Sequence, residues 1–302
     1  MSNLEILKEF LENNNYSFKE NELLKLHTSF KIGGNASLFV SPSDENELKE
    51  ITDKCKKLSV KFYILGNGTN VLFSDKGFDG VVISTTEKMN GIRRIDETSF
   101  ECDAGVTLSA VCNYALENSL SGFEYLYGIP GTVGGAIITN AGAYGGEISD
   151  VAVEVKHIDE NGNFGSYIGQ EIDFSYRHSA YENNNYTICS VVFTCQKGDK
   201  SEIKAKMTDL IGRRKDKQPL EYPSAGSTFK RPVGGYAAAL IDQAGLKGTH
   251  VGDAEVSVKH SGFVINKGNA TCSDVLELVE IIKQRVLDNS GITLELEVRV
   301  VE

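Results

Sequence analysis

The sequence has no tryptophan, only 5 prolines and 3 methionines among its 302 residues. It also has no apolar run of 18 residues, which excludes a membrane-spanning helix. The first residues, MSNLEILKEFLENNNYSF, carry glutamates where a secretory signal needs a basic segment and then a continuous apolar run. We therefore expect a cytoplasmic protein with no membrane partner.

Positive charge is also in short supply. The chain has 31 lysines and arginines against 42 aspartates and glutamates, a formal net charge of −11, and no block of basic residues. This composition lacks the electrostatic footprint of a nucleic-acid binder, although one local basic pocket could still hold a phosphate. The hydrophobic share of 40% suffices for a sizeable core, and the length suits two domains or one large one.

Spacings typical of metal sites and redox dithiols are missing too. The cysteines form no C-x-x-C pair, and the histidines have neither ligand spacing nor a companion nucleophile. We therefore expect no metal, no histidine-based hydrolase and reduced thiols in the core. The residues concerned are Cys55, Cys102, Cys112, Cys189, Cys195 and Cys272, and His27, His157, His178, His250 and His260.

The N-terminal half of the chain predicts a helical lead-in followed by a βαβ pattern. Leucines at helical spacing lie in residues 4–11, and residues 25–34 predict an extended segment that ends in a glycine turn. A strand is predicted from Ala36, then a helix over 45–58 with Asp44 and Glu47 as a capping box, then the strand KFYIL.

The rest of the chain predicts mixed helices and strands. Short strands fill 71–101, an amphipathic helix begins at Leu108, and 148–196 predict an antiparallel sheet. We place a domain boundary near residue 200. Beyond it, helices, the strand HSGFVIN and a final alternating strand over 292–300 predict an α+β domain.

Glycine is concentrated in two loops. GNGTN, at 66–70, follows a predicted strand, but it lacks the third glycine of the dinucleotide fingerprint and there is no P-loop. Alone it is also compatible with a simple glycine turn. The second segment, 128–146, holds 7 of the 30 glycines and has no charged side chain, so we expect an irregular loop. Two such loops predict a large phosphate-bearing cofactor, because consecutive N–H groups bind anions.

Three polar residues stand out in otherwise ordinary segments. Arg177 lies in the aromatic stretch FSYRHSAY, Ser227 in the loop AGSTFKRP, and Glu297 on the polar side of the last strand. Each has a plain structural alternative: a surface ion pair, a turn serine and a solvated strand face, respectively.

Together these segments carry a resemblance. The order HTSFKIGG, LGNGTNVLFSD, GIPGTVGGAIITNAGAYGGE, YRHSAY, AGSTFKRP and LELEVRVV resembles the UDP-N-acetylenolpyruvoylglucosamine reductases, from about His27 to Arg299. The resemblance implies a flavoenzyme of peptidoglycan precursor synthesis. It would use non-covalent FAD, with NADPH as reductant, to reduce the enolpyruvyl ether of UDP-N-acetylglucosamine to UDP-N-acetylmuramate.

The resemblance also implies a fold. It is an α+β protein with a vanillyl-alcohol-oxidase-like (PCMH-type) FAD-binding fold in two subdomains and a C-terminal α+β substrate-binding domain. The expected divisions are a lead-in over 1–25, an FAD-binding domain over 26–199 (subdomains about 26–85 and 86–199), and a substrate-binding domain over 200–302. The partner is a small-molecule substrate, with no nucleic acid, no membrane and no obligatory protein partner.

Site residues carry over position by position from the resemblance. Arg177 would bind the substrate carboxylate, Ser227 would protonate the carbon that bears it, and Glu297 would donate a hydrogen bond to the intermediate. Tyr176 and Lys217 would bind substrate, Lys217 at the diphosphate, with Arg214 and Arg231 as weaker phosphate candidates. The expected cofactor contacts are Gly66, Asn67, Gly68, Thr69, Asn70, Gly131, Thr132, Gly134, Gly135, Asn140 and Gly142.

Some features leave alternatives open. Only four residues, 182–185, separate YRHSAY from YTICSVV, so the chain resembles the branch that lacks a longer substrate-covering loop. Arg231 also stands where that family has asparagine. The competing functions are a flavin-dependent alcohol or sugar oxidase of the same fold, a flavin- or nucleotide-binding sensor, and nucleotide binding without flavin.

Overall fold

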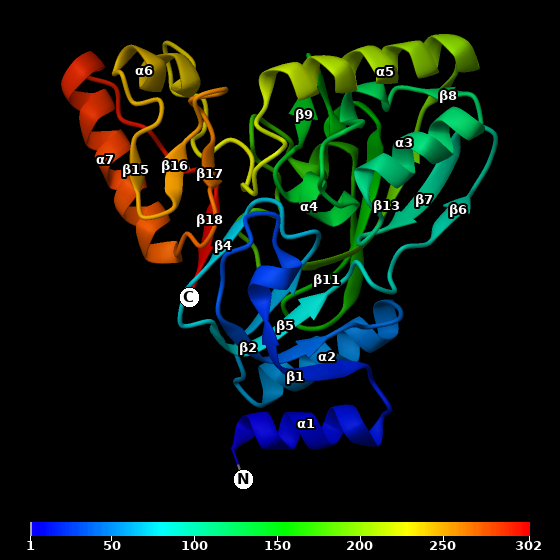
Figure 1. Ribbon diagram of the computed structural model, residues 1–302. Coiled ribbons are helices and arrows are strands. Elements are labelled where there is room, and N and C mark those ends of the chain that lie inside the picture. The colour runs from blue at the N-terminus through cyan, green and yellow to red at the C-terminus, as the bar shows by residue number, and fades with distance from the viewer. Residues whose placement is uncertain (1) are drawn as a thin grey trace. The chain divides into compact units, whose positions relative to one another are not determined.

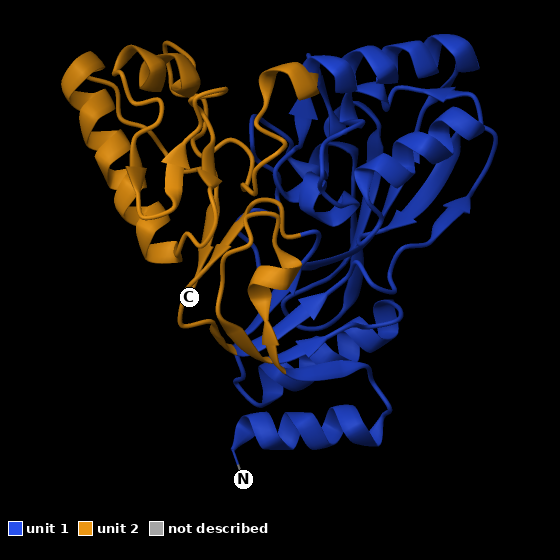
Figure 2. Ribbon diagram, viewed as in Figure 1, with its two compact units in different colours: residues 1–20, 38–67, 80–213 blue, residues 21–37, 68–79, 214–302 orange. Residues whose placement is uncertain are grey.

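The computed structural model describes residues 2–302 (Figure 1). The chain divides into two compact units, neither continuous in sequence (Figure 2). Unit 1 comprises residues 1–20, 38–67 and 80–213, and unit 2 comprises 21–37, 68–79 and 214–302. Packing alone defines these units, so the expected division into FAD-binding and substrate-binding domains stays a prediction.

Helices form where the sequence offers caps and an apolar stripe. Ser2 caps the first helix, with Glu5 completing its capping box, and Leu7 and Leu11 are buried on one face, as predicted. Asp44 caps the second helix, but the Glu47 carboxylate accepts from the N–H of Ser43 instead of Asp44. Within residues 2–302 the α-helices are α1 (Asn3–Asn13), α2 (Glu45–Lys57), α3 (Leu108–Glu117), α4 (Val133–Ile138), α5 (Lys200–Lys217), α6 (Ala237–Gln243) and α7 (Cys272–Ser290).

A five-stranded antiparallel sheet forms the larger part of unit 1. Its strands are, in spatial order, β12 (Phe164–Ile168), β11 (Ala152–Ile158), β13 (Thr187–Thr194), β7 (Ser99–Asp103) and β6 (Ile92–Arg94). The antiparallel sheet predicted over 148–196 is therefore confirmed, with two further strands added from earlier in the chain. α3, α4 and the start of α5 contribute to the apolar core that also includes Phe100 and Phe193.

A four-stranded sheet occupies the N-terminal region, with the spatial order β1 (Phe18–Leu23), β2 (Asn35–Val40), β5 (Phe78–Ser84) and β3 (Phe62–Leu65). β3 and β5 pair in parallel, as the βαβ pattern requires. α1 and α2 bury Leu7, Leu11, Leu48 and Ile51 in a common core with β2 and β5. The chain passes from one unit to the other within β1, β2 and β5.

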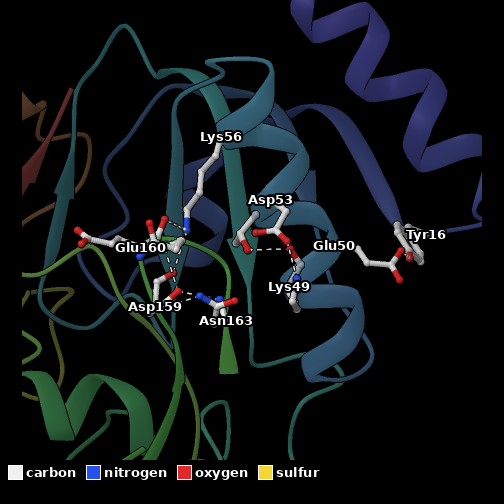
Figure 3. Close-up of polar contacts among 10 residues, drawn as sticks. Tyr16, Lys49, Glu50, Asp53, Lys56, Asp159, Glu160 and Asn163 are labelled. Atoms are coloured by element: carbon white, nitrogen blue, oxygen red, sulfur yellow. Dashed lines mark hydrogen bonds and ion pairs between the residues drawn. The ribbon is translucent and has the colours of Figure 1, made fainter. Parts of the chain in front are cut away.

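Polar side chains fasten α2 to its neighbours in unit 1 (Figure 3). The Lys56 ammonium donates to the carbonyl oxygens of Asp159 and Glu160, each at 3.1 Å, in the turn between β11 and β12. Glu50 of the same helix accepts a hydrogen bond from the Tyr16 hydroxyl, and burial, followed by this carboxylate, raises the pKa of Tyr16 to about 12. Both contacts secure the helix beside the sheet that leads into residues 66–70.

Unit 2 is built on one long helix. α7 and α6 share an apolar core with the antiparallel sheet β15 (His250–Val251), β16 (Ala254–Val256) and β17 (Val264–Asn266). β4 (Val71–Phe73) and β18 (Arg299–Val301) pair in parallel in the same unit. Asp75, just after β4, accepts from the N–H groups of Cys272 and Ser273 at 2.7 and 3.0 Å, and so caps α7.

Three local predictions were wrong. The start of the predicted extended segment, residues 25–27, belongs to the 3-10 helix η1 (Leu24–His27). The segment 128–146 is not wholly irregular, because Thr132 caps α4 and apolar residues continue it; the two short strands β9 (Gly142–Ala143) and β10 (Gly146–Glu147) also pair there. The predicted strand over 292–300 shrinks to β18, since the backbones of Glu295 and Glu297 hydrogen-bond to the loop of residues 228–230 rather than to a sheet.

The cysteines behave as the sequence predicted. All six are free and buried, and burial raises the pKa of each thiol. Across residues 2–302, no helix combines the length and apolar content needed to cross a membrane.

Candidate active site

The loop of residues 66–70 connects β3 of unit 1 to β4 of unit 2, so its two ends belong to different units. In unit 1, the side-chain amide of Asn67 donates to the carbonyl of Pro130 at 2.6 Å. In unit 2, the side-chain amide of Asn70 donates to the carbonyl of Glu297 at 3.1 Å. Each of the two asparagines therefore fastens its own end of the loop within its own unit.

The two glycines of the loop are required by packing. A Cβ at Gly66 would lie 2.4 Å from the Thr132 hydroxyl oxygen. Gly68 has a φ of +60°, and a Cβ there would lie 2.1 Å from the carbonyl oxygen of His27. Each glycine is thus demanded by protein contacts within its own unit, whether or not a ligand is present.

Carbonyl groups of this loop accept hydrogen bonds from the protein, whereas its backbone N–H groups do not donate to their own units within residues 2–302. The Gly68 carbonyl accepts from the N–H of Ser29 at 3.1 Å, and the Asn70 carbonyl accepts from the N–H of Arg299 at 3.0 Å. Within residues 2–302, by contrast, none of the N–H groups of residues 66–70 donates to a group of its own unit. Five consecutive amides of this kind suit an anionic ligand.

At the N-terminus of α4, by contrast, the backbone N–H groups donate to protein groups. The N–H of Val133 donates to the Val106 carbonyl at 2.8 Å, and that of Gly134 donates to Ala104 at 2.9 Å. Gly135 donates its N–H to the Thr132 hydroxyl, which caps the helix. Because the N–H groups of Val133, Gly134 and Gly135 are hydrogen-bonded within the protein, they do not form an anion site at the start of this helix.

Asn140 joins the glycine-rich segment to the turn that carries Arg177. It is buried, and its amide donates to the Glu147 carboxylate at 2.8 Å and to the Ser175 carbonyl at 3.1 Å. Its side-chain oxygen accepts from the N–H of Ser149. The structure therefore gives Asn140 a supporting position for Arg177, and a contact with the cofactor stays a prediction.

Arg177 occupies the tip of a two-residue turn in unit 1. Ser175 and His178 exchange both backbone hydrogen bonds across it, each at 3.1 Å. Arg177 has a φ of +54°, in the left-handed region that non-glycine residues rarely adopt. Its guanidinium lies 5.2 Å from the centre of the exposed Tyr176 ring. The two hydrogen bonds between Ser175 and His178 close the turn and hold Arg177 in this conformation.

His178 stabilises the same turn from its other side. Its Nδ1 lies 2.7 Å from the Glu182 carboxylate and its Nε2 lies 3.5 Å from Asp173. The hydrogen bond to Glu182, and then the Asp173 carboxylate, raise the pKa of His178 above its usual range.

In unit 2 the segments of Ser227 and Glu297 run side by side. The N–H of Glu297 donates to the Thr228 carbonyl and the N–H of Lys230 donates to the Glu295 carbonyl, both at 2.9 Å. Phe229 and Leu296 form an antiparallel bridge between these bonds. Two segments nearly 70 residues apart in sequence are therefore held in register, as separate strands of a sheet would be.

Ser227 itself is exposed. Its hydroxyl makes no hydrogen bond within residues 2–302, while the next residue, Thr228, is buried and accepts from the N–H of Val264 at 2.9 Å. A hydroxyl that the fold leaves unused on a well-anchored backbone is available to a ligand. Glu297 is half-buried.

Lys217 is the exposed last residue of α5 and also belongs to unit 2. Burial, and then the charges of Lys247 and Lys217, lower the pKa of His260. Lys217 thus contributes to a positive potential in unit 2 although the net charge of the chain is −11. Arg231 is exposed, with its guanidinium 4.2 Å from the centre of the Tyr236 ring.

Ser29 had no role predicted from the sequence, and in the structure it hydrogen-bonds two loops of unit 2. Its hydroxyl donates to the Ser224 carbonyl at 2.6 Å, and its N–H donates to the Gly68 carbonyl. It therefore joins the 66–70 loop to the loop of Ser227. The signal was the small polar residue in the motif HTSFKIGG, a motif to which the sequence alone assigned no chemistry.

Comparisons with known proteins agree with this arrangement. Residues 218–301 match the C-terminal domain of UDP-N-acetylenolpyruvoylglucosamine reductase, and residues 36–164 match an FAD-binding domain. Named UDP-N-acetylenolpyruvoylglucosamine reductases are similar along nearly the whole chain. The protein of Clostridium novyi is 50% identical over 283 residues, which cover 94% of this chain and 92% of that protein. The protein of Caldanaerobacter subterraneus is 48% identical over 281 residues, which cover 93% of this chain and 92% of that protein.

Solved structures show the same likeness. The crystal structure of UDP-N-acetylenolpyruvylglucosamine reductase from Thermus caldophilus has a TM-score of 0.79 and 35% identity, covering 95% of this chain and 99% of that one. A berberine bridge enzyme variant, at 17% identity, shares the fold alone with a TM-score of 0.52 over 64% of this chain and 44% of that one. The expected α+β, vanillyl-alcohol-oxidase-like FAD-binding fold is confirmed, and the chain belongs to the UDP-N-acetylenolpyruvoylglucosamine reductase family.

Proposed function

We propose that this chain uses FAD to reduce the enolpyruvyl group of UDP-N-acetylglucosamine enolpyruvate with NADPH, giving UDP-N-acetylmuramate for peptidoglycan synthesis. Family membership along 94% of the chain supports the reaction. The observation that carries it here is the joining, in unit 2, of the 66–70 loop, the Ser227 loop and the Glu297 segment through backbone hydrogen bonds. An oxidase of the same fold is not favoured, because the relatives that match along the whole chain are reductases.

The residues present fit FAD. The amides of residues 66–70 do not donate within their own units in the described chain, and a row of amides neutralises a diphosphate without added cations. The glycine-rich stretch from Gly131 to Gly142 would contact the cofactor through groups other than the first amides of α4, because those amides are already hydrogen-bonded to the protein. When bound, the flavin supplies the route by which two electrons pass from NADPH to the terminal carbon of the enolpyruvyl group as a hydride.

The protein side chains would then stabilise the negative charge of the intermediate and donate one proton. Hydride addition at the terminal carbon moves an electron pair toward the carboxylate and leaves an enediolate-like charge. Arg177 would bind that carboxylate through its planar donors, and Glu297 in its protonated form would donate a hydrogen bond to the same charge. Ser227 would give its hydroxyl proton to the carbon bearing the carboxylate, which completes the reduction. The net reaction consumes one NADPH and one proton for each enolpyruvyl group.

The remaining assignments follow the same function. Lys217 would bind the substrate diphosphate and Tyr176 would contact the substrate, with FAD held mainly by residues 26–199 and substrate by 200–302. The enzyme would work in the cytoplasm on a small-molecule substrate, without nucleic acid, membrane or an obligatory protein partner.

Visible absorption of the purified protein tests the function directly. We expect a flavin band that bleaches when NADPH is added anaerobically and returns when the enolpyruvyl sugar nucleotide follows. A band that returns only with oxygen would support the oxidase instead. A colourless protein that FAD cannot reconstitute would remove the cofactor from the proposal.

A further inference from the structure

The two asparagines of the 66–70 loop have different partners, and this difference separates their roles. Asn67 is exposed and donates to the Pro130 carbonyl in unit 1. Asn70 is half-buried and donates to the carbonyl of Glu297 in unit 2. Both side chains make a single amide-to-carbonyl bond, so the two residues form a matched pair within one loop.

Asn70 holds the Glu297 segment at two points. Its side-chain amide donates to the Glu297 carbonyl at 3.1 Å, and its own carbonyl accepts from the N–H of Arg299 at 3.0 Å. The second bond continues the parallel pairing of β4 with β18, where Arg299 lies opposite Val71. The first bond reaches two residues beyond the end of that pairing, to Glu297.

The backbone of Glu297 needs such a bond because it lies outside any regular strand. Its N–H donates to Thr228 and its carbonyl accepts from Asn70, so the peptide groups on its two sides are fixed by partners from two different segments. The direction of the Cα–Cβ bond, and hence of the carboxyl group, follows from these peptide planes. Loss of the Asn70 bond would free one of them.

We propose that Asn70 is a positioning residue that aligns the Glu297 carboxyl group for the reduction of substrate, in addition to its place in the cofactor loop. The inference rests on the proposed function. A displacement of about 1 Å in a group that acts on the reacting atoms can slow a reaction about 100-fold. The step that depends on Glu297 is therefore affected more than the step in which NADPH reduces the flavin.

The test separates the two half-reactions of the FAD holoenzyme by stopped-flow absorption. With FAD saturating, we expect Asn70→Ala to slow reoxidation by the enolpyruvyl substrate about 10- to 100-fold more than it slows bleaching by NADPH. Asn67→Ala removes the equivalent bond to Pro130 and is the matched variant. It should weaken FAD binding and slow both half-reactions together.

A double-mutant cycle distinguishes positioning from a general structural effect. If Asn70 acts through Glu297, Asn70→Ala should slow reoxidation much less in the Glu297→Ala background than in wild type, because no carboxyl group remains to align. A readout without catalysis is amide hydrogen exchange of residues 292–300 in the FAD holoenzyme without substrate. Exchange there should accelerate in Asn70→Ala and remain unchanged in Asn67→Ala.

Three results would overturn the inference. They are equal slowing by Asn70→Ala in both backgrounds, equal slowing of both half-reactions, and unchanged exchange over 292–300. None of them contradicts the proposed function, which fails separately if wild-type reduced flavin is not reoxidised by the enolpyruvyl substrate.

Discussion

The N–H of Glu297 donates to the carbonyl oxygen of Thr228 at 2.9 Å. This bond joins Glu297, the proposed hydrogen-bond donor to the intermediate, to the residue after Ser227. The buried Thr228 hydroxyl is in turn bonded to the N–H of Val264. The peptide beside Ser227 is therefore anchored from two directions, while the Ser227 hydroxyl faces outward without a partner within residues 2–302.

Ser227→Ala should therefore separate catalysis from folding. The change removes no hydrogen bond of the described chain, so the free energy of unfolding should stay within about 0.5 kcal/mol of wild type. Reoxidation of the reduced flavin by substrate should slow about 10²- to 10⁴-fold, because a positioned proton donor contributes that much. Urea unfolding and stopped-flow absorption measure the two effects.

Ser224→Ala in the same loop is the control for that variant. It keeps the backbone carbonyl that accepts from Ser29, so both half-reactions should stay within about twofold of wild type. Unchanged reoxidation in Ser227→Ala would remove Ser227 as the proton donor.

Glu297 is expected to act as a hydrogen-bond donor. Glu297→Gln should then keep more activity than Glu297→Ala, because the amide can donate in similar geometry; Ala should lose about 10²- to 10³-fold in the reoxidation rate. Glu295→Ala is the control, since Glu295 is an exposed carboxylate two residues away that pairs with Lys230. Equal losses in the Gln and Ala variants would contradict the role.

Much of the fold could be predicted because its signals are local. The leucine spacing of α1, the Asp44 cap of α2 and the strand-forming runs of β11 and β13 each lie within a few consecutive residues. The prediction failed where long-range contacts decide the conformation. The last strand is short because Glu295 and Glu297 bond to the loop of residues 228–230, and this loop has no strand pattern.

The site shows the same limit more strongly. Sequence could single out Arg177, Ser227 and Glu297 only through a resemblance, since each residue type occurs in many ordinary positions. Ser29 lies 195 residues from Ser224 in the chain, and Asn70 lies 227 residues from Glu297, so no local pattern encodes either bond. Glycine content was also an ambiguous signal, because packing alone requires Gly66 and Gly68.

Arg177→Gly should uncouple stability from activity. The left-handed conformation of Arg177 costs a non-glycine residue roughly 1–2 kcal/mol, whereas glycine adopts it without this strain. The greater freedom of glycine in the unfolded chain offsets about 0.5–1 kcal/mol, and the contact with the Tyr176 ring is lost, so we expect stability within about 1 kcal/mol of wild type. The reoxidation rate should nevertheless fall about 100-fold or more, because the cation that faces the substrate carboxylate is lost.

Lys31→Gly is the matched control for Arg177→Gly. Lys31 is exposed and has a φ of +57°, close to that of Arg177. Its replacement should likewise change stability by no more than about 1 kcal/mol and leave both half-reactions unaltered. Full activity of Arg177→Gly would exclude Arg177 from binding the carboxylate.

The buried thiols give a prediction that does not involve catalysis. Burial raises the pKa of all six cysteines, and the thiolate is the reactive form. A disulfide reagent should therefore label the native protein slowly and all 6 thiols rapidly after unfolding in urea. Rapid labelling of a thiol in the folded protein, or fewer than 6 thiols after unfolding, would contradict the buried, reduced state.

His178 and His157 should titrate in opposite directions. The Glu182 hydrogen bond raises the pKa of His178, whereas burial lowers that of His157, whose Nδ1 lies 2.7 Å from the Tyr181 hydroxyl. Histidine ring signals in NMR should thus give a pKa above about 6.5 for His178 and below it for His157. Glu182→Gln should return the pKa of His178 toward its usual value and leave that of His157 unchanged.

The same two shifts determine how stability depends on pH. A raised pKa in the folded state means that the His178 contribution is fully present below about pH 6.5 and is lost as pH rises through the raised value. The neutral state of His157 has the opposite sign, and its contribution is lost as pH falls from about 6.5 toward the lowered value. The difference in unfolding free energy between wild type and Glu182→Gln should therefore shrink as pH rises in a series of urea titrations. A difference that grows with pH would show that Glu182 does not stabilise the charged form of His178, and the side-chain support of the turn carrying Arg177 would then come from Asn140 and Asp173.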